Sequence, residues 1–589
     1  MTTVFLIATE LTLPRLLWRA ARRRPTCVIE TRTLAQGHPG LIGRLVERLR
    51  AADRITTLAD RPDLPPHADA GDFQRLTNAF AESEAWMEQR FDFAGSDARF
   101  GRHAIAYRHI LCNEMFRRTL RGALVEAAAA HGPVIGLDRL DRDYARHRFG
   151  RNHGGRPMSA VADRAIGAAL ALLGAGALVG WVLSRLQLRP PPAREILLAS
   201  DFLGGDRDLL LWRELSDSPE LVQVVFRDTE TRTRYGEQAA GWPCCMPTDG
   251  WFGPRAAAAM LAEGLADLAR LYRAGRALPA DLLRPLLVLP WKRAMYRALF
   301  NRIRPRFYWG RDDYNADHII RTQELRRIGG ISVGIMHGVP SIIPFSHQIR
   351  HIDFDRYYVQ GAAVTAPYRD KWPAGMRIRP IGSVGLDRAE LERLATPCPN
   401  DIVVILSPTF HQDAIFAAVR EIAAAFPDRT LWINTKGSYR HRGRFGALFQ
   451  ALVEDGIPNL REYPGRSYDL FFQARYWISE STTLIGEAAQ FGRIGLSLDL
   501  DSRQKFLYYR AFPTMRVTSA AEAIGRIRAI EADETSYDRR GLAGLIRLDG
   551  AVCWDLLRQD FGLPPRGTGP LSHLAFVPAA PGETVEEQP

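Results

Sequence analysis

The chain has 589 residues, of which 46% are hydrophobic and 24% are charged. This length predicts three or four domains, and the composition is typical of a folded, largely soluble protein. The six cysteines show neither CxxC pairing nor regular spacing, which argues against a disulfide scaffold or a zinc site and favours a reducing cytosol. Arg15 and Arg19 interrupt the first apolar stretch too early for a secretory signal, so we expect a cytoplasmic protein.

The formal net charge is +12, and the excess is concentrated in one stretch. Between Arg102 and Arg194, 15 arginines stand against six acidic residues. Such a stretch suits either nucleic acid or an anionic membrane. Because no helix-turn-helix, zinc finger or aromatic RNA-binding signature accompanies it, we rank an anionic inner-membrane surface first and expect no nucleic acid as a partner.

Residues 1–155 are expected to form an N-terminal α/β domain, whose role the sequence does not indicate. Short apolar runs alternate with longer stretches that lack Gly and Pro, which predicts strands and helices respectively. The expected strands lie at Val4–Ala8, Cys27–Glu30 and Val134–Leu137, and the expected helices at Leu11–Ala21, Phe73–Phe91 and Ile105–Ala130.

An apolar helix is expected within residues 160–188. Ala165–Leu183 has 19 residues without a charge, which is long enough to cross a membrane. More arginines precede it than follow it, so a single crossing would leave the C-terminal two-thirds outside the cell, away from nucleotide-activated donors. Two interpretations stay open: a helix in the inner leaflet at the cytoplasmic face of the membrane, or a buried core helix.

The remaining chain is predicted to form two Rossmann-like lobes. Pro190–Pro192 is a stiff linker, and strands alternate with helices from there to about residue 535, which is the pattern of parallel α/β sheets. We place the first lobe at 194–390 and the second at 391–565. Residues 566–589 are rich in Pro and Gly and end in acidic residues, so we expect a disordered tail.

Two polar segments follow strands in the first lobe. An aromatic strand beginning at Phe307 runs into Asp312 and Asp313, and the strand Ile331–Met336 delivers His337 followed by a glycine. Ligands of open α/β sheets lie at this carboxyl edge of the strands. His337 is therefore a candidate general base, with Asp312 and Asp313 as alternatives. A loop histidine bonded to a neighbouring carbonyl is the competing interpretation.

Strand ends of the second lobe carry candidate donor-binding groups. The strand Asp401–Leu406 ends in Ser407, Thr409 and His411, and the next strand ends in Lys436. A lysine beside a glycine at a strand end suits a diphosphate. A solvated loop lysine is the alternative. Between the lobes, the glycines of residues 382–387 form either an interlobe hinge or ordinary turns.

A further strand of the second lobe leads into a hydroxyl-rich turn. Ser481, Thr482 and Thr483 precede a short helix that carries Glu487 one turn later. Unpaired N–H groups at a helix start bind anions, and Glu487 could reach a ribose hydroxyl. The alternative is that Ser481 only caps the helix.

Residues Phe307–Leu500 together resemble GT-B glycosyltransferases and the related CDP-glycerol glycerophosphotransferases of bacterial surface-polysaccharide synthesis. The resemblance rests on the order of five elements: His337-Gly338, Tyr357–Val359, Gly382–Asp387, Lys436 and Ser481–Ala488. It implies two GT-B-like lobes, a base at His337, donor phosphates at the Ser481–Thr483 turn and a donor sugar or ribose on Glu487. The family's Lys-x-His-Pro is absent, because Gly437 and Ser438 follow the lysine, which favours a sugar donor over glycerol phosphate.

The sequence therefore predicts an inverting glycosyltransferase without metal or other cofactor, moving a sugar from a nucleotide-sugar donor to a glycan or lipid-linked acceptor. Two Asp-x-Asp tripeptides, at Asp353 and Asp499, match a metal-binding pattern of other transferases, but that pattern is common by chance. One alternative is an alditol-phosphate transferase on the same fold. Another is a non-catalytic, membrane-associated scaffold of polysaccharide assembly, motivated by the basic stretch before Ala165.

Overall fold

The computed structural model describes residues 4–7, 26–29, 55–56, 80–129, 134–135, 140, 143–144, 146–147, 160–310, 315–336, 338, 349–407, 412–437, 439–441, 443–480, 482–500, 508–567 and 569–578. They fall into two compact units. The first unit comprises Met1–Leu188 and Phe252–Ala294, and the second comprises Arg189–Trp251 and Met295–Pro589. The expected helix at Leu11–Ala21 lies outside the described residues.

A four-stranded parallel sheet opens the first unit, in the order β3-β2-β1-β4. Its strands are β1 (Val4–Ile7), β2 (Thr26–Ile29), β3 (Ile55–Thr56) and β4 (Val134–Ile135). The long helix α7 (Ala104–Ala129) contacts β1 and β4. Three of the four strands lie where the apolar runs of the sequence placed them, whereas β3, a two-residue strand, was not predicted because it is too short for a periodic pattern.

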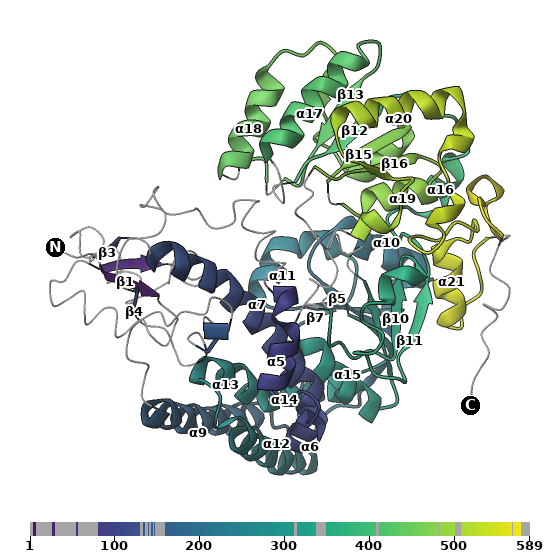
Figure 1. Cartoon of the computed structure of the whole chain (residues 1–589). Coiled ribbons are helices and arrows are strands. Elements are labelled where there is room, and N and C mark those ends of the chain that lie inside the picture. The colour runs from purple at the N-terminus through teal and green to yellow at the C-terminus, as the bar shows by residue number, and fades with distance from the viewer. Residues whose placement is uncertain are drawn as a thin grey trace. The chain divides into compact units, whose positions relative to one another are not determined.

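Helices complete the first unit: α5 (Glu84–Arg90), α6 (Ser96–Phe100), α9 (Ala160–Ser184), α12 (Pro254–Gly275) and α13 (Ala280–Leu287). Both α12 and α13 contact the apolar helix α9, although they are inserted in the sequence between parts of the second unit (Figure 1). The sequence-based division had assigned residues 252–294 to the first lobe. Buried Met260, Gly264 and Leu268 of α12 face α9, and a pattern of apolar residues alone does not say which surface it will cover.

The second unit contains two parallel sheets. The seven-stranded sheet of the first lobe has the order β11-β10-β9-β8-β5-β6-β7. Its strands are β5 (Arg194–Phe202), β6 (Val222–Phe226), β7 (Cys244–Cys245), β8 (Ile303–Gly310), β9 (Ile331–Ile335), β10 (Arg356–Val359) and β11 (Arg377–Pro380). Most strand residues of β6, β8 and β10 are buried, as expected for parallel strands covered by helices on both faces.

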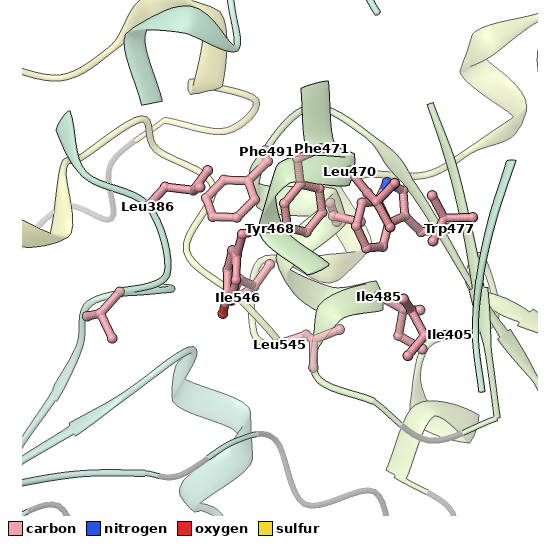
Figure 2. Close-up of a cluster of buried hydrophobic side chains, with 14 of the residues drawn as sticks. Leu386, Ile405, Tyr468, Leu470, Phe471, Trp477, Ile485, Phe491, Leu545 and Ile546 are labelled. Atoms are coloured by element: carbon pink, nitrogen blue, oxygen red, sulfur yellow. The ribbon is translucent and has the colours of Figure 1, made fainter. Parts of the chain in front are cut away.

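The six-stranded sheet of the second lobe has the order β14-β13-β12-β15-β16-β17. Its strands are β12 (Ile402–Ile405), β13 (Leu431–Asn434), β14 (Leu460–Glu462), β15 (Tyr476–Ser479), β16 (Ile494–Leu498) and β17 (Arg516–Val517). Figure 2 shows part of its core, where Phe471 stacks on Trp477 with ring centroids 3.9 Å apart and meets Phe491 edge to face. The predicted GT-B-like fold with two Rossmann-like lobes is confirmed.

Helices flank both sheets (Figure 1). The helices of the second unit are α10 (Asp206–Leu215), α11 (Thr229–Tyr235), α15 (Asp317–Arg327), α16 (Arg388–Arg393), α17 (Gln412–Ala425), α18 (Gly443–Glu454), α19 (Leu484–Gln490), α20 (Ala520–Ala532) and α21 (Cys553–Asp560). Helix α14 (Leu289–Arg302) begins in the first unit and ends in the second.

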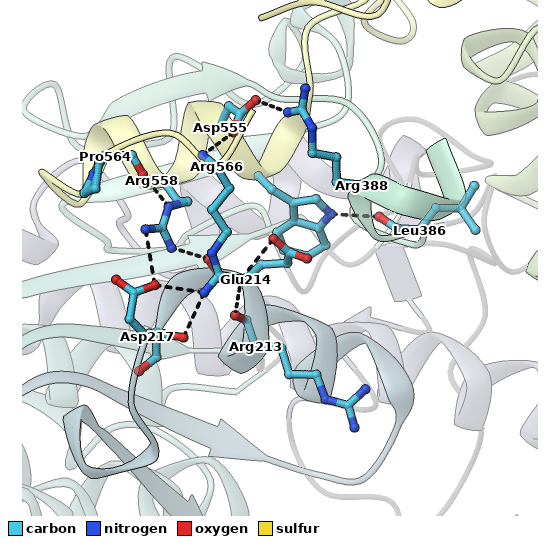
Figure 3. Close-up of polar contacts among 11 residues, drawn as sticks. Arg213, Glu214, Asp217, Leu386, Arg388, Asp555, Arg558, Pro564 and Arg566 are labelled. Carbon is cyan, nitrogen blue, oxygen red and sulfur yellow. Dashed lines mark hydrogen bonds and ion pairs between the residues drawn. The ribbon is translucent and has the colours of Figure 1, made fainter. Parts of the chain in front are cut away.

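Helix α21 returns to the first lobe and contacts α10, although its sequence position had placed it in the second. Arg558 donates to the carbonyls of Glu214 and Pro564, at 2.7 and 2.6 Å, and Arg566 donates to the carbonyl of Arg213 at 2.6 Å (Figure 3). Arg388 of α16 pairs with Asp555. The side chains of Arg388, Asp555, Arg558 and Arg566 are called the C-terminal clamp below.

The prediction that disorder begins at residue 566 is wrong for residues 566–567 and 569–578. Arg566 belongs to the C-terminal clamp, and Leu574 is 5% exposed. The backbone N–H of Phe576 donates to the carbonyl of Leu548 at 2.7 Å. Apolar residues among the prolines and glycines therefore anchor this part of the tail, and residues 579–589 lie outside the described residues.

Candidate functional site

The direction in which successive strands are added reverses at the centre of each large parallel sheet. In the first lobe β5 lies between β6 and β8, and in the second lobe β12 lies between β13 and β15. From β5 the chain adds β6 and β7 on one side and β8 to β11 on the other, and from β12 it adds β13 and β14 on one side and β15 to β17 on the other. The loops after β5 and β8, and those after β12 and β15, therefore lead to opposite sides and leave a crevice between them. Ligands of doubly wound sheets bind in such a crevice at the carboxyl ends of the strands.

Predicted donor-binding residues flank the crevice of the second lobe. Ser407 follows β12, and Thr482 and Thr483 follow β15. Ser479 at the end of β15 donates its hydroxyl proton to the carbonyl of Ile405 at 2.8 Å, which joins the two strand ends. Thr482 Oγ1 accepts from the backbone N–H of Leu484 at 3.4 Å, so Thr482 provides a side-chain acceptor at the start of α19.

The strand-end glycine of the first lobe meets this same turn. A Cβ added to Gly338 would lie 2.5 Å from Cγ2 of Thr483, so any larger residue here would require the side chain of Thr483 to move. Gly338 and Thr483 are 145 residues apart in the sequence and follow strands of different sheets. The segment after β9 and the segment after β15 thus lie against one another. The predicted base, His337, directly precedes Gly338, but it lies outside the described residues.

Glu487 is fully buried and faces the first lobe. Its Oε1 accepts from Nε2 of Gln360 at 2.9 Å and from a guanidinium nitrogen of Arg207 at 3.3 Å. Arg207 also donates to the hydroxyl of Tyr468, and burial raises the pKa of that phenol, which stays neutral. The second carboxylate oxygen, Oε2, has no hydrogen-bond partner among the described residues. In this arrangement Glu487 connects the lobes, and its role toward a ribose remains a prediction.

Lys436 stands exposed at the end of β13. Its Nζ lies 5.9 Å from the ring centroid of Tyr439, and among the described residues it forms no ion pair. The preceding residue, Thr435, is 5% exposed, and its hydroxyl has no hydrogen-bond partner among the residues that the structure describes. A buried hydroxyl without a partner is costly unless a ligand or water satisfies it, so this strand end has free capacity for a polar ligand.

A buried charged group at the crevice of the first lobe was not predicted. Tyr308 donates its hydroxyl proton to Oδ1 of Asp201 at 2.7 Å, and Arg321 of α15 pairs with Oδ2. Nη2 of Arg321 has no hydrogen-bond partner among the described residues. It lies so close to Gly310 that a Cβ added to that glycine would be only 1.9 Å away from it. The sequence signal was weak: Asp201 ends an apolar strand, but Tyr308 and Arg321 look like ordinary strand and helix residues.

A small cavity of about 40 Å³ opens between these elements of the first lobe. Trp309 near the end of β8, Ile335 at the end of β9, Met336 directly after it and Arg207 of α10 contribute to the lining. This volume holds little more than a water molecule.

Several predicted residues fall outside the described part of the chain: Asp312, Asp313, His337, Thr409, His411 and Ser481. The described aspartates of the two Asp-x-Asp tripeptides form ion pairs with arginines. Asp353 and Asp355 both pair with Arg326. Asp499 pairs with Arg510 and Arg516. Three of the four carboxylates therefore have arginine partners, and the fourth, Asp501, lies outside the described residues.

No family model and no curated protein matches the chain. Among solved structures, it is similar to UDP-GlcNAc 2-epimerase from Neisseria meningitidis bound to UDP-GlcNAc (10% identity, 59% of this chain and 94% of that one, TM-score 0.39). It is also similar to Os79 from O. sativa in complex with UDP (14% identity, 62% and 99% coverage, TM-score 0.38). Since both TM-scores lie below 0.5, the fold assignment rests on the two parallel sheets of the chain itself.

Proposed function

We propose that the chain is a glycosyltransferase that uses a nucleotide-sugar donor and extends a surface polysaccharide or lipid-linked glycan in the cytoplasm. The contact between Gly338 and Thr483 carries this proposal, because it joins the carboxyl edge of the first sheet to the hydroxyl-rich turn of the second. Free polar capacity at Thr435 and Lys436 supports a phosphate-bearing ligand at the same edge of the second sheet.

The reaction follows from the proposed roles. An acceptor hydroxyl gives its proton to His337, and its oxygen attacks the anomeric carbon of the donor sugar. The bond between that carbon and the donor phosphate breaks, and the bonding electrons leave with the nucleotide. Lys436 and the hydroxyls of Thr482 and Thr483 would stabilise the charge on the departing phosphate. Attack from the face opposite the leaving group inverts the anomeric centre.

Thermal unfolding with CMP-, CDP-, UDP-, GDP- and dTDP-linked ligands tests the proposal. A ligand at about 100 times its Kd stabilises the folded state by roughly 2.7 kcal/mol, so one nucleotide class should raise the unfolding temperature clearly. Lys436→Ala should weaken that shift, while Lys371→Ala, which removes a lysine paired with Asp370, should not. No shift with any nucleotide would leave the scaffold interpretation.

For every donor class of that panel except CMP-linked sugars, product analysis separates the two catalytic alternatives. Transfer of a sugar from a nucleoside diphosphate sugar releases a nucleoside diphosphate, whereas transfer of an alditol phosphate from a CDP-alditol releases CMP. His337→Ala should abolish release while leaving the thermal shift intact, since acid–base assistance contributes about 10²–10⁴-fold to rate and little to donor binding. Retained release in this variant would remove His337 from the mechanism.

A further inference from the structure

Helix α9 presents an apolar face that nothing in the described structure covers. Among the described residues, Arg164–Ser184 is the one helix long and apolar enough to cross a membrane, yet only 17% of its apolar window is buried. Leu172, Leu173 and Leu183 are 76%, 70% and 53% exposed. A helix of a water-soluble unit normally turns charged or polar side chains outward, but Ala165–Leu183 contains none.

The opposite face of α9 packs on α12. Gly174 contacts Leu268, and Leu178 contacts Gly264, so the two helices run antiparallel side by side. Leu178 is 1% exposed. The stripe of small residues on α9 therefore serves close packing at Gly174, whereas a Cβ added to Gly176 or Gly180 would meet nothing within 4 Å.

This packing excludes a membrane crossing by α9 in the folded unit. Alongside its middle, α12 carries Glu263, Asp267, Arg270 and Arg273. Inserting α9 across a bilayer would carry these charges into the hydrocarbon, where charged side chains are very unfavourable. A helix that is apolar on one face and attached to a charged protein on the other can instead lie in the plane of the interface.

Charge and aromatic residues at the helix ends fit such a surface. Arg164 precedes the apolar stretch and is exposed. Arg284 is exposed on α13, the helix whose Leu283 lies against Gly167 of α9. Arg185 follows the stretch and lies 6.0 Å from the ring centroid of Trp181. Arginines attract anionic headgroups, and tryptophan is enriched at the level of the headgroups. We propose that α9 docks the chain in the plane of an anionic lipid bilayer, with Leu172, Leu173 and Leu183 inserted among the acyl chains.

A lipid surface fits these observations better than a second copy of the chain. Arg164 and Arg185 at the two ends of α9 would repel the same surface of another copy, whereas an anionic bilayer is complementary to them. This inference does not depend on the proposed transferase activity, because it concerns a surface of the first unit.

Co-sedimentation with vesicles of phosphatidylcholine, with and without phosphatidylglycerol, measures the docking. We expect binding to the anionic vesicles that weakens with salt. The double variant Leu172→Ser/Leu173→Ser should bind about 100-fold more weakly, because it lacks the two leucine side chains whose transfer from water into the acyl chains favours binding. Leu221→Ser is the matched control: Leu221 is 43% exposed in the second unit, and its loss should leave binding unchanged.

Labelling of bound protein tests the orientation. Cysteines introduced by Arg164→Cys and Gln187→Cys should both react with a membrane-impermeant maleimide added outside the vesicles, because α9 lies in the plane. Protection of one end alone would show a crossing and overturn the proposal. The proposal would also be overturned if the wild-type protein did not co-sediment with anionic vesicles. So would a lipid-free dimer that the double leucine variant dissociates, since α9 would then be an interface between copies.

Discussion

The C-terminal clamp and the strand-end groups of the second unit are both buried and polar, but they differ in how completely they are satisfied. In the clamp, Arg558 is 2% exposed and its guanidinium reaches two carbonyls and a carboxylate. At the strand ends, Thr435 Oγ1, Glu487 Oε2 and Gln360 Oε1 have no hydrogen-bond partner among the described residues. A folded protein rarely leaves buried polar atoms unpaired without another use for them. The contrast therefore assigns stability to the clamp and ligand binding to the strand ends.

Arg558→Ala should give the largest effect on stability. It leaves the carbonyls of Glu214 and Pro564 without their donor and opens a cavity under α21, so we expect a loss of about 3 kcal/mol in the free energy of unfolding. Denaturant unfolding followed by tryptophan fluorescence measures it. Arg566→Ala removes a more exposed guanidinium and should cost about 1 kcal/mol.

The nucleotide-induced shift of these clamp variants serves as the control. Since the clamp residues lie on α16, on α21 and directly after α21, away from the strand ends, the shift relative to the ligand-free variant should equal that of the wild type. A selective loss of nucleotide binding in Arg558→Ala would break the distinction between the two regions.

Glu487→Gln should have an intermediate effect on stability. The substitution keeps the shape but removes the charge that faces Arg207, so we expect a loss of about 2 kcal/mol. Because the sequence predicts that Glu487 holds the donor sugar or ribose, and Oε2 is its unpaired oxygen, nucleotide affinity should fall as well. The unfolding free energy and the ligand-induced shift are measured on the same preparations.

A double variant separates the two roles of Glu487. In Arg207→Met/Glu487→Leu, apolar side chains replace both the half-buried Arg207 and the buried Glu487, and such a replacement often restores stability. We expect recovered stability without recovered nucleotide affinity. If both recover together, the carboxylate acts on the donor only by connecting the lobes.

Much of the architecture of the second unit could be predicted from sequence. The strands β5, β9, β12, β13 and β15 are short apolar runs that end in polar residues. Their short length and their β-branched or aromatic residues distinguish such runs from helices. The right-handed crossover rule then limits the possible strand orders without fixing one. Because Ser407 and Thr483 both follow strands of a parallel sheet, the sequence alone places them at one edge of the sheet.

Interactions between distant segments could not be predicted. The sequence places Glu487 one turn into a short helix, but only the fold brings Arg207 and Gln360 against it. The return of α21 to the first lobe depends on Arg558 and on Trp554, whose indole donates to the carbonyl of Leu386 at 2.7 Å. No local pattern in the sequence encodes such pairings, because they depend on how whole elements pack.

Thr435→Val should have a small effect of the opposite sign. Valine fills the same volume without a hydroxyl, so removing an unpaired buried polar atom should leave stability unchanged or raise it by about 1 kcal/mol. Nucleotide affinity should fall if that hydroxyl meets the donor. Thr322→Val is the matched control, since Thr322 donates its hydroxyl proton to the carbonyl of Asp353 at 2.8 Å and should lose stability without losing affinity.

His103 of the first unit offers a second explanation for an unpaired buried atom, which is a buried imidazole that stays neutral. It gives the smallest and most local of the predictions. The ring is fully buried, and its Nε2 lies 3.0 Å from Oδ2 of Asp267 while Nδ1 has no partner among the described residues. Burial lowers the pKa of this imidazole below its ordinary 6.5, with the charges of Arg293 and Arg102 adding to the effect and Asp267 opposing it. Although burial alone would raise the pKa of Asp267, its hydrogen bonds and the nearby charges lower that pKa to about 2, so it stays ionised from pH 7 to 5.

The unfolded chain therefore takes up a proton at His103 that the folded chain resists. The free energy of unfolding of this unit should therefore be highest above pH 6.5 and decrease as the pH falls below 6.5. Hydrogen exchange in peptides covering α12 should accelerate between pH 7 and 5 beyond its intrinsic pH dependence, and His103→Gln should flatten that response. A response that persists in His103→Gln would mean that another group titrates. A flattened one would show that an unpaired nitrogen here reflects a neutral buried histidine, so that an unpaired atom indicates a ligand site only where strand ends also converge.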